Sequence, residues 1–287
     1  MYKKIDLHLH TSISDGSDSL EELLDNVRAA GISLFSVSDH DAILGGLRMP
    51  ELLTHGDPDF IRGVEFSCKD ELGKYHVLGY GYDPDAPAIQ EVVEQGHALR
   101  MEKLTGRLNY LNEEFGFQFP QEELDMLYAK ENPGKPHIAL MMIKHGYAES
   151  IQEAIEKYID KKRFRNKHVR PEVAIEGILK SGGIPVLAHP CYGSGDELIL
   201  KDEMEERLRR LMGFGLMGLE GYYSGFPQKL SQEMIGLAEK YGLYVTAGSD
   251  YHGANKMVPL GDNDLEDAAQ GPEGLHRFLQ DVEIISK

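Results

Sequence analysis

Short apolar runs recur along the chain and predict a set of buried strands. Each run has four to six residues and is rich in Val, Ile, Leu, Phe or Tyr, which is typical of strands with little access to water. Helical patterns separate most of the runs, and this alternation favours an α/β fold with a mostly parallel sheet. The seven predicted strands are Ile5–Leu9, Leu34–Val37, Phe60–Glu65, Tyr75–Tyr80, Ile184–Ala188, Leu216–Glu220 and Leu243–Ala247.

Three of the helical patterns carry start or stop signals. Before Leu20–Ala30, Ser19 stands at the N-cap position, and Glu22 completes the pattern of a capping box. Pro171–Ser181 begins with a proline, which is favoured in the first turn of a helix. Leu230–Tyr241 is followed by a glycine, which is the usual stop signal.

The middle of the chain breaks this alternation. Between residues 88 and 167 we find helical spacing of apolar residues and no convincing strand. The predicted helical segments are Leu99–Leu111, Gln121–Tyr128, His137–His145 and Ile151–Ile159. We therefore expect residues 1–87 and 170–287 to form one α/β domain, and residues 88–169 to form a helical insertion that caps it.

Length and composition fit a globular protein with one large core. The chain has 287 residues, of which 41% are hydrophobic and 27% are charged. No apolar run approaches the ~20 residues that cross a bilayer, and few residues precede the first predicted strand, so we expect neither a membrane span nor a signal peptide. Cys68 and Cys191 are too few for a disulfide framework. A cytoplasmic protein is the simplest interpretation, and nothing indicates an obligate protein partner.

The net charge of −18 argues against long nucleic acids as partners. Binding to DNA or RNA depends on a basic face that neutralises phosphates. The basic run at residues 161–170 stands out in so acidic a chain. Strong acidity with one local basic cluster favours a small ligand held in a basic pocket.

Histidines and carboxylates gather where the predicted strands end. In a strand, residues two apart point to the same side, so His8 and His10 project together, with Asp6 behind them. Such pairs of imidazoles are half of a metal site, and nine nitrogen and oxygen ligands exceed what one tetrahedral ion uses. Without a thiolate, Zn²⁺, Mn²⁺ or Fe fits, with carboxylates shared between several ions. The nine candidates are His8, His10, Asp15, His40, Glu65, His76, His189, Asp250 and His252.

The motifs around these residues resemble those of the PHP (polymerase and histidinol phosphatase) family. The order and spacing match over nearly the whole chain. The insertion, in Gly134-Lys135-Pro136-His137, resembles that of the branch that hydrolyses small nucleotides and sugar phosphates. The motifs are His8-Leu9-His10, Ser38-Asp39-His40-Asp41, Gly63-Val64-Glu65, Ala188-His189-Pro190 and Gly248-Ser249-Asp250-Tyr251-His252.

The resemblance implies a distorted (β/α)₇ barrel with three divalent ions, Mn²⁺ first and Zn²⁺ or Fe²⁺ next. The first ion would be held by His8, His10, Glu65 and Asp250. The second would be held by Glu65, His76 and His189. The third would be held by Asp15, His40 and His252. The chain has Lys135 where that branch is expected to have Arg, which replaces a planar fork with a point charge.

The expected function is that of a metal-dependent phosphoesterase on a small phosphorylated metabolite. A hydroxide that bridges two ions would attack phosphorus, and Asp15 or His252 would help to protonate the leaving group. Nucleoside 3′,5′-bisphosphates, nucleoside monophosphates and cyclic sugar phosphates are the candidate substrates. For substrate contacts the candidates are Lys135, His137, Arg163, Arg165 and Tyr222, with Tyr223 beside the last.

Three other functions stay open at this point. A 5′→3′ exoribonuclease would act on short RNA, although the acidic charge predicts activity that falls with length. An amidohydrolase also opens its barrel with His-x-His, but such sites commonly use a carbamylated lysine where Glu65 stands here. A non-catalytic metal-binding accessory protein would keep the ligands without turnover. Glu220, at the end of the sixth predicted strand, is a candidate hydrogen-bond partner of the ligands.

Overall fold

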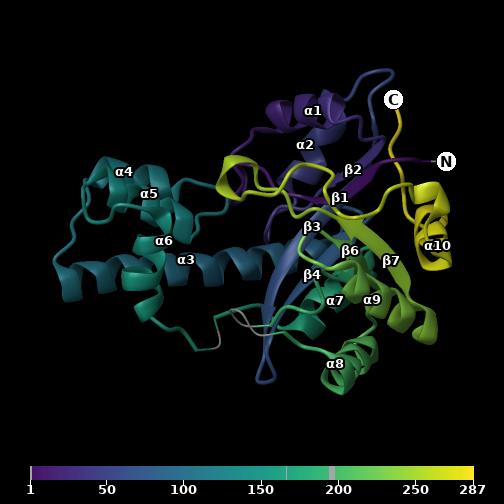
Figure 1. Cartoon of the computed structure of the whole chain (residues 1–287). Coiled ribbons are helices and arrows are strands. Elements are labelled where there is room, and N and C mark those ends of the chain that lie inside the picture. The colour runs from purple at the N-terminus through teal and green to yellow at the C-terminus, as the bar shows by residue number, and fades with distance from the viewer. Residues whose placement is uncertain (1, 166, 194–197) are drawn as a thin grey trace.

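Seven strands form a single sheet whose order follows the chain. The computed structural model describes residues 2–165, 167–193 and 198–287, and Figure 1 shows the strands at the centre with helices around them. The strands are β1 (Ile5–Leu9), β2 (Leu34–Val37), β3 (Asp59–Lys69), β4 (Lys74–Tyr80), β5 (Ile184–Leu187), β6 (Gly218–Tyr223) and β7 (Tyr244–Gly248).

The first and last strands approach each other and nearly close the sheet into a barrel. The backbone N–H of His10 donates to the Tyr251 carbonyl at 2.9 Å, and that of Asp250 donates to the His8 carbonyl at 2.9 Å. The chain just after β7 therefore completes the ring at the end of β1. This confirms the distorted seven-strand barrel of the sequence analysis.

One strand runs against the rest. β4 is antiparallel to both β3 and β5, whereas the other four pairs are parallel. The expectation that Glu65 closes the third strand is wrong, because β3 continues to Lys69 and turns back as a hairpin. As a result His76, near the start of β4, lies at the same end of the barrel as the carboxyl ends of β3 and β5.

Helices cover the outside of the barrel. The predicted capping box is present, since the Ser19 hydroxyl accepts from the N–H of Glu22 and the Glu22 carboxylate accepts from the N–H of Ser19. The helices over 44–52, 201–213 and 273–281 are not among the helical patterns predicted from the sequence. The barrel helices are α1 (Leu20–Ala29), α2 (Leu44–Leu52), α7 (Pro171–Lys180), α8 (Lys201–Gly213), α9 (Gln228–Tyr241) and α10 (Glu273–Asp281).

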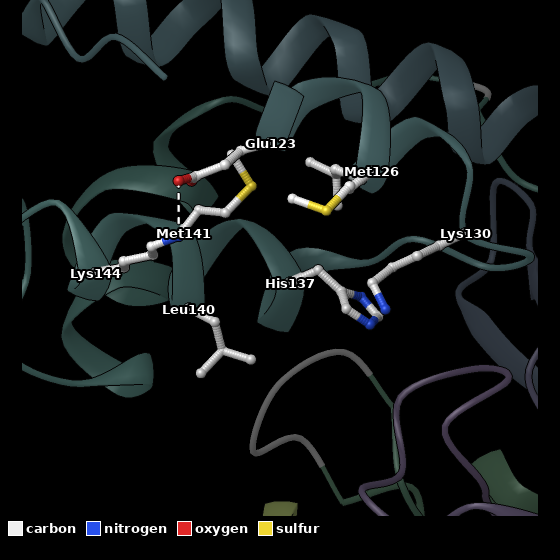
Figure 2. A pocket seen from close by; sticks show the side chains of 8 residues that line it. Glu123, Met126, Lys130, His137, Leu140, Met141 and Lys144 are labelled. Atoms are coloured by element: carbon white, nitrogen blue, oxygen red, sulfur yellow. Dashed lines mark hydrogen bonds and ion pairs between the residues drawn. The ribbon is translucent and has the colours of Figure 1, made fainter. Parts of the chain in front are cut away.

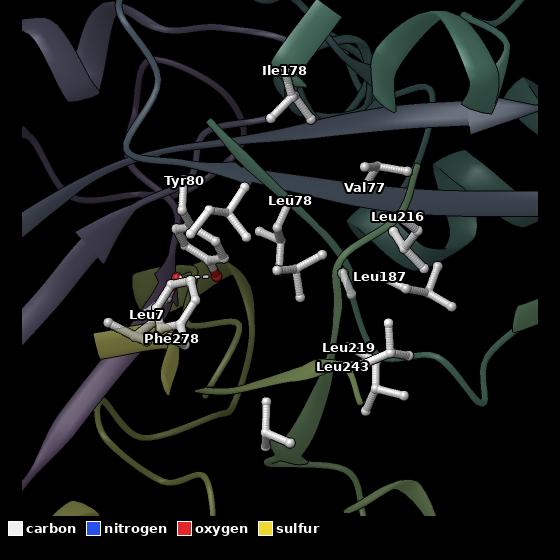
Figure 3. Close-up of a cluster of buried hydrophobic side chains, with 14 of the residues drawn as sticks. Leu7, Val77, Leu78, Tyr80, Ile178, Leu187, Leu216, Leu219, Leu243 and Phe278 are labelled. Carbon is white, nitrogen blue, oxygen red and sulfur yellow. Dashed lines mark hydrogen bonds between the residues drawn. The ribbon is translucent and has the colours of Figure 1, made fainter. Parts of the chain in front are cut away.

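The main core lies on both faces of the sheet, since Ile178 of α7 packs at Gly79 whereas Leu78 and Tyr80 point to the opposite face of β4 (Figure 3). Leu7 and Leu78 are fully buried, and Tyr80 buries its ring while its hydroxyl donates to the Leu7 carbonyl at 2.8 Å. Both cysteines are buried free thiols. Burial of this kind, at about 25 cal/mol per Å² of apolar surface, holds the strands in register and so fixes their ends.

The inserted helices form a separate layer beside the barrel (Figure 1). They are α3 (Pro87–Phe115), α4 (Gln121–Tyr128), α5 (Lys135–Lys144) and α6 (Ile151–Glu153), followed by a π-helical turn (Ala154–Tyr158) and a 3₁₀ turn (Ile159–Lys161). Leu104, Leu111 and Ile138 belong to a buried cluster of their own. The first half of α3 packs on α7, where Val92 contacts Gly177, so this helix links insertion and barrel. The domain limits near residues 88 and 169 stay a prediction.

Among the described residues, no helix has the combined length and apolar character that a bilayer span requires.

Candidate metal centre

The nine predicted ligand side chains lie together at one end of the barrel. Glu65 is the centre of the group, with a side chain that is 1% exposed. Its two carboxylate oxygens lie within 3.3 Å of ring nitrogens from five histidines: His8, His10, His40, His76 and His189. Strands β1, β3 and β4 and the loops after β2 and β5 supply these side chains, so the fold brings together residues that are distant in the sequence.

Three groups of these side chains have the spacing of metal ligands, with ligand atoms within 4.8 Å of one another. The first is His8, His10, Glu65 and Asp250, which is the set expected for the first ion. The second is His40, Glu65 and His76; His189, expected for that ion, is outside this group, although its Nε2 lies 3.2 Å from Oε1 of Glu65. The third is Asp15, His40 and His252, as expected, together with His10.

The rings themselves form a continuous belt. The centroids of His10 and His252 are 4.1 Å apart, and those of His10 and His40 are 4.6 Å apart. The belt continues through His76 and His189, whose centroids are 5.0 Å apart. The rings thus crowd around the carboxylates of Asp15, Glu65 and Asp250, and several ring nitrogens face the same carboxylate oxygens.

Four buried atoms of these side chains make no hydrogen bond to any described residue. They are Nε2 of His8, both ring nitrogens of His10, and Oε2 of Glu65. Buried polar atoms without partners are rare because each costs about 1–3 kcal/mol. The ring nitrogens and the carboxylate oxygen are ligands that Zn²⁺, Mn²⁺ and Fe²⁺ accept, so the residues present fit divalent ions.

The electrostatics of the group agree with this fit. Burial opposes a charge on His10, but the carboxylates of Asp250 and Glu65 outweigh burial and raise its pKa to about 10. Burial also opposes a charge on Glu65, but the surrounding imidazoles, first that of His40, hold its pKa well below the ordinary value. The protein thus places concentrated negative charge next to imidazoles, and a divalent cation neutralises that charge without protonating the rings.

Glu220 orients the ligands from behind. One carboxylate oxygen lies 3.0 Å from Nδ1 of His8, and the other accepts the backbone N–H of His189 at 2.7 Å. The side chain is fully buried. Glu220 therefore fixes the direction of the His8 ring, as the sequence analysis expected for a hydrogen-bond partner of the ligands.

Asp250 is held by two residues from outside the ligand set. Its Oδ2 accepts from the Tyr223 hydroxyl at 2.9 Å and from Nζ of Lys256 at 2.5 Å. This leaves Oδ1 for the group, 3.3 Å from Nε2 of His10. Sequence reasoning missed Lys256, because one lysine in a polar loop carries no pattern.

The backbone near the site takes unusual conformations. Asp250 has a φ of 58° and His189 a φ of 27°, which are rare for residues with a side chain and concentrate at functional sites. Gly248 stands where a Cβ atom would lie 2.2 Å from Cβ of His8 and 2.6 Å from Oε1 of Glu220. Only glycine allows β7 to pass this close to the His8 side chain.

Two contacts attach the insertion to the metal-ligand end of the barrel. The guanidinium of Arg100, on α3, pairs with Asp41, the neighbour of His40. The side-chain amide of Asn132 donates to the backbone carbonyl of His40. The sequence analysis missed both residues, since charged and polar positions on a helix or loop are most often solvated.

The residues predicted to contact the substrate differ in their exposure and in their bonding partners. Lys135 forms an ion pair with Asp160 at 2.5 Å and is 35% exposed. His137 is half-buried on α5, and its Nδ1 accepts the N–H of Gly134 at 3.0 Å. Arg163 is exposed and has no side-chain contact among the described residues.

Arg165 is exposed as well. Its neighbour Asn166 lies outside the described residues. Tyr222 packs against the main core, whereas Tyr223 reaches the site, its ring centroid 5.4 Å from that of His189. A register shift between Glu220 and Tyr222 turns the strand and explains the difference. Cys191 has a buried thiol whose pKa burial raises to about 12, which disfavours the thiolate that binds metals.

Comparison with known families agrees with this geometry. The profile of the PHP domain matches residues 6–223. The chain belongs to the PHP family. The matched span contains seven of the nine ligand candidates, and the other two, Asp250 and His252, follow it.

Three characterised proteins are similar to this PHP chain over most of their length. A phosphoribosyl 1,2-cyclic phosphate 1,2-diphosphodiesterase from Eggerthella lenta is 28% identical, covering 88% of this chain and 96% of the relative. A 5′-3′ exoribonuclease from Haemophilus influenzae is 27% identical, covering 93% and 97%. A 3′,5′-nucleoside bisphosphate phosphatase from Chromobacterium violaceum is 27% identical, covering 86% and 87%.

A solved structure agrees with the fold and the chemistry. It is that of a proposed metal-dependent phosphoesterase from Bifidobacterium adolescentis, with a TM-score of 0.79, 25% identity, and coverage of 98% of this chain and 97% of that one. The chain is an enzyme, a metal-dependent phosphoesterase of the PHP family, as the sequence analysis expected. This sets aside the non-catalytic accessory protein.

Proposed function

We propose that this enzyme hydrolyses a small sugar-based metabolite that carries two phosphate groups, one at the metal centre and one on a row of basic side chains. The row consists of Arg100, Lys103 and Arg107 on α3. Their spacing puts all three on one face of the helix. The distance along the axis from the first to the last is about 10 Å.

The observation that carries the proposal is that this cationic row lacks enough anions. Lys103 pairs with no carboxylate among the described residues, and Nε of Arg107 is buried without a hydrogen bond there. Burial, with Arg100 and other cations nearby, lowers the pKa of Lys103 to about 8. A bound phosphate would relieve this repulsion and supply the missing acceptors.

The row lies beside the metal centre and faces further cations. Arg100 is joined to Asp41, next to the candidate ligand His40. Lys135 lies close enough to contribute to the lowered pKa of Lys103. A substrate with its reactive phosphate at the metals can therefore reach this row with a second one. Two phosphates are common to the bisphosphate and cyclic phosphoribosyl compounds named for two of the relatives.

The proposed metal assignment is three divalent ions, with Mn²⁺ as the first candidate. When bound, they would polarise a phosphoryl group and activate a water molecule. Glu65 would be the ligand shared between ions, because its two oxygens face different groups of histidines. Glu220 and Lys256 would hold His8 and Asp250 in position.

Asp15 and His252 are the proposed residues for proton transfer to the leaving oxygen. Nε2 of His252 lies 3.3 Å from Oδ1 of Asp15, so both side chains would act at the same point beside the third ion. The side chain of His252 is 12% exposed and that of Asp15 is 28% exposed, whereas those of His8 and His10 are fully buried. The pair thus lies on the accessible side of the group, where a leaving group can reach it.

The test compares two phosphate esters in the Mn²⁺-loaded enzyme. We expect Lys103→Met to lower kcat/KM for adenosine 3′,5′-bisphosphate by about tenfold or more, since a charged hydrogen bond is worth about 1.5–3 kcal/mol. Activity on p-nitrophenyl phosphate should stay within about threefold of the parent. Lys161→Met, an exposed lysine of the same insertion, is the matched control. Equal loss on both esters would remove the row from substrate binding.

A 5′→3′ exoribonuclease remains the second candidate, because a relative of this activity covers nearly the whole chain. The cationic row is long enough for more than one backbone phosphate. The net charge of −18 predicts that turnover decreases as the oligonucleotide lengthens. A series of RNA oligonucleotides of increasing length, compared with the bisphosphate, separates the two functions.

A further inference from the structure

A cavity lies on the insertion, between α4 and α5, and neither the metal centre nor the cationic row uses it. Its volume is about 420 Å³, within the range of small-molecule sites. Met126 and Leu140 are 57% and 51% exposed, unusually so for large apolar side chains. Met141 adds a second thioether to the lining. Two flexible thioethers and a leucine offer an apolar surface of the kind that binds a flat ring.

The polar groups of this cavity lie at its two ends. Figure 2 shows the ring of His137 beside the amine of Lys130 at one end, and the ion pair of Glu123 with Lys144 at the other. That ion pair has an N–O distance of 2.8 Å. Lys130 pairs with no carboxylate in the part of the chain that the structure describes. Its ammonium is free to contact an anion or a ring nitrogen.

His137 connects the cavity with the barrel. Burial and the nearby Lys130 lower its pKa to about 4. A Cβ atom at Gly134 would lie 4.0 Å from Nδ1 of His137 and 3.8 Å from a guanidinium nitrogen of Arg100, so this ring lies near the first residue of the cationic row. Its Nδ1 is an acceptor for the Gly134 N–H, which leaves Nε2 as a donor. The end of the cavity that carries His137 and Lys130 therefore lies next to Arg100, whose partner Asp41 neighbours the candidate metal ligand His40.

We infer that the cavity between α4 and α5 binds the nucleobase of a nucleotide substrate whose phosphates lie on the barrel side. This inference rests on the proposed function, which places those phosphates. A base fits the volume, stacks on the thioethers of Met126 and Met141, and reaches polar groups with its edge. Among the candidate substrates, the cavity thus favours nucleoside bisphosphates over sugar phosphates that have no base.

The experiment compares adenosine 3′,5′-bisphosphate with the same ribose bisphosphate lacking the base, in the Mn²⁺-loaded enzyme. We expect kcat/KM to be about tenfold or more higher for the nucleotide, the effect of burying one face of an apolar ring. Met126→Ser and Leu140→Ser should each reduce this preference and leave the baseless compound unaffected. The matched controls are Met257→Ser and Leu72→Ser, which alter exposed side chains outside the insertion.

Equal kcat/KM for the two compounds, or equal loss on both in the cavity variants, would overturn the inference while leaving the proposed function intact. If neither compound is hydrolysed, the proposed function fails. A binding measurement then tests separately whether the cavity holds a nucleobase. Titration with the fluorescent nucleoside 2-aminopurine riboside should then show saturable binding that Met126→Ser weakens. Absence of that binding would also overturn the inference.

Discussion

The metal-ligand end of the barrel and the face of the insertion beside it are built in opposite ways. At the barrel, His8 and His10 are fully buried and Glu65 is 1% exposed. On the insertion, Met126 and Leu140 are more than half exposed. Rigid burial suits a centre whose ligands must hold fixed positions, whereas exposed side chains on short helices can change without disturbing the core. We therefore expect the chemistry to depend on the barrel and the choice of substrate to depend on the insertion.

The largest effect should follow from a change in the barrel. Glu65→Ala removes the carboxylate that faces five imidazoles, and we expect bound metal to fall and kcat to drop by roughly a thousandfold or more, beyond the 10–100-fold typical of a residue that only orients a ligand. Metal content by mass spectrometry and phosphate release measure both. Glu239→Ala, on the exposed side of α9, is the control. A variant that keeps its metal and turnover would contradict the role of Glu65.

A second change tests the tight packing behind the site. Gly248→Ala forces a methyl group against His8 and Glu220, and we expect a loss of about 1–3 kcal/mol in the free energy of unfolding, with weaker metal binding. In Gly236→Ala, on α9, the added methyl group meets no atom within 4 Å, so that variant should gain about 0.5–1 kcal/mol. Urea unfolding of the metal-free proteins measures both. An unchanged stability in Gly248→Ala would show that the barrel end is looser than described.

A smaller effect is expected from pH on the insertion. His137 has a pKa of about 4 in the folded protein, because of burial and Lys130, against an ordinary value of about 6.5. The unfolded chain then binds the proton first, so His137 lowers the free energy of unfolding as pH falls from about 6.5 to about 4. His137→Gln should reduce this loss. Urea unfolding in EDTA at about pH 7.5 and about pH 5, with the exposed His55→Gln as control, measures the difference. A pH dependence identical to the parent's would contradict it.

The same contrast explains what the sequence could predict. β1 and β2 have the predicted bounds, because continuous apolar runs between polar segments leave little choice. The ligand candidates were found because they lie in or just after such runs, and the ends of strands converge in a barrel. The direction of β4 could not be predicted, since an apolar run is the same in either direction; the hairpin after Lys69 decides it.

Residues outside the strands were harder to find. Arg100 and Lys103 look like the solvated face of a long helix, and only the folded chain brings them beside Asp41. Tyr222 and Tyr223 are adjacent candidates in the sequence, and only the structure, with its register shift in β6, shows that Tyr223 reaches the site while Tyr222 packs on the core. Basic residues at 163 and 165 stood out by composition, yet they are exposed. Composition identifies a cluster, but packing decides where it faces.

The central claim is that the buried side chains around Glu65 hold a cluster of divalent cations. Anomalous diffraction from a crystal grown with Mn²⁺ tests it most directly. We predict three separate manganese peaks, one within coordinating distance of each group, with Glu65 bound to two of them. A map with no peak at these side chains, or with peaks only at surface carboxylates, would contradict it.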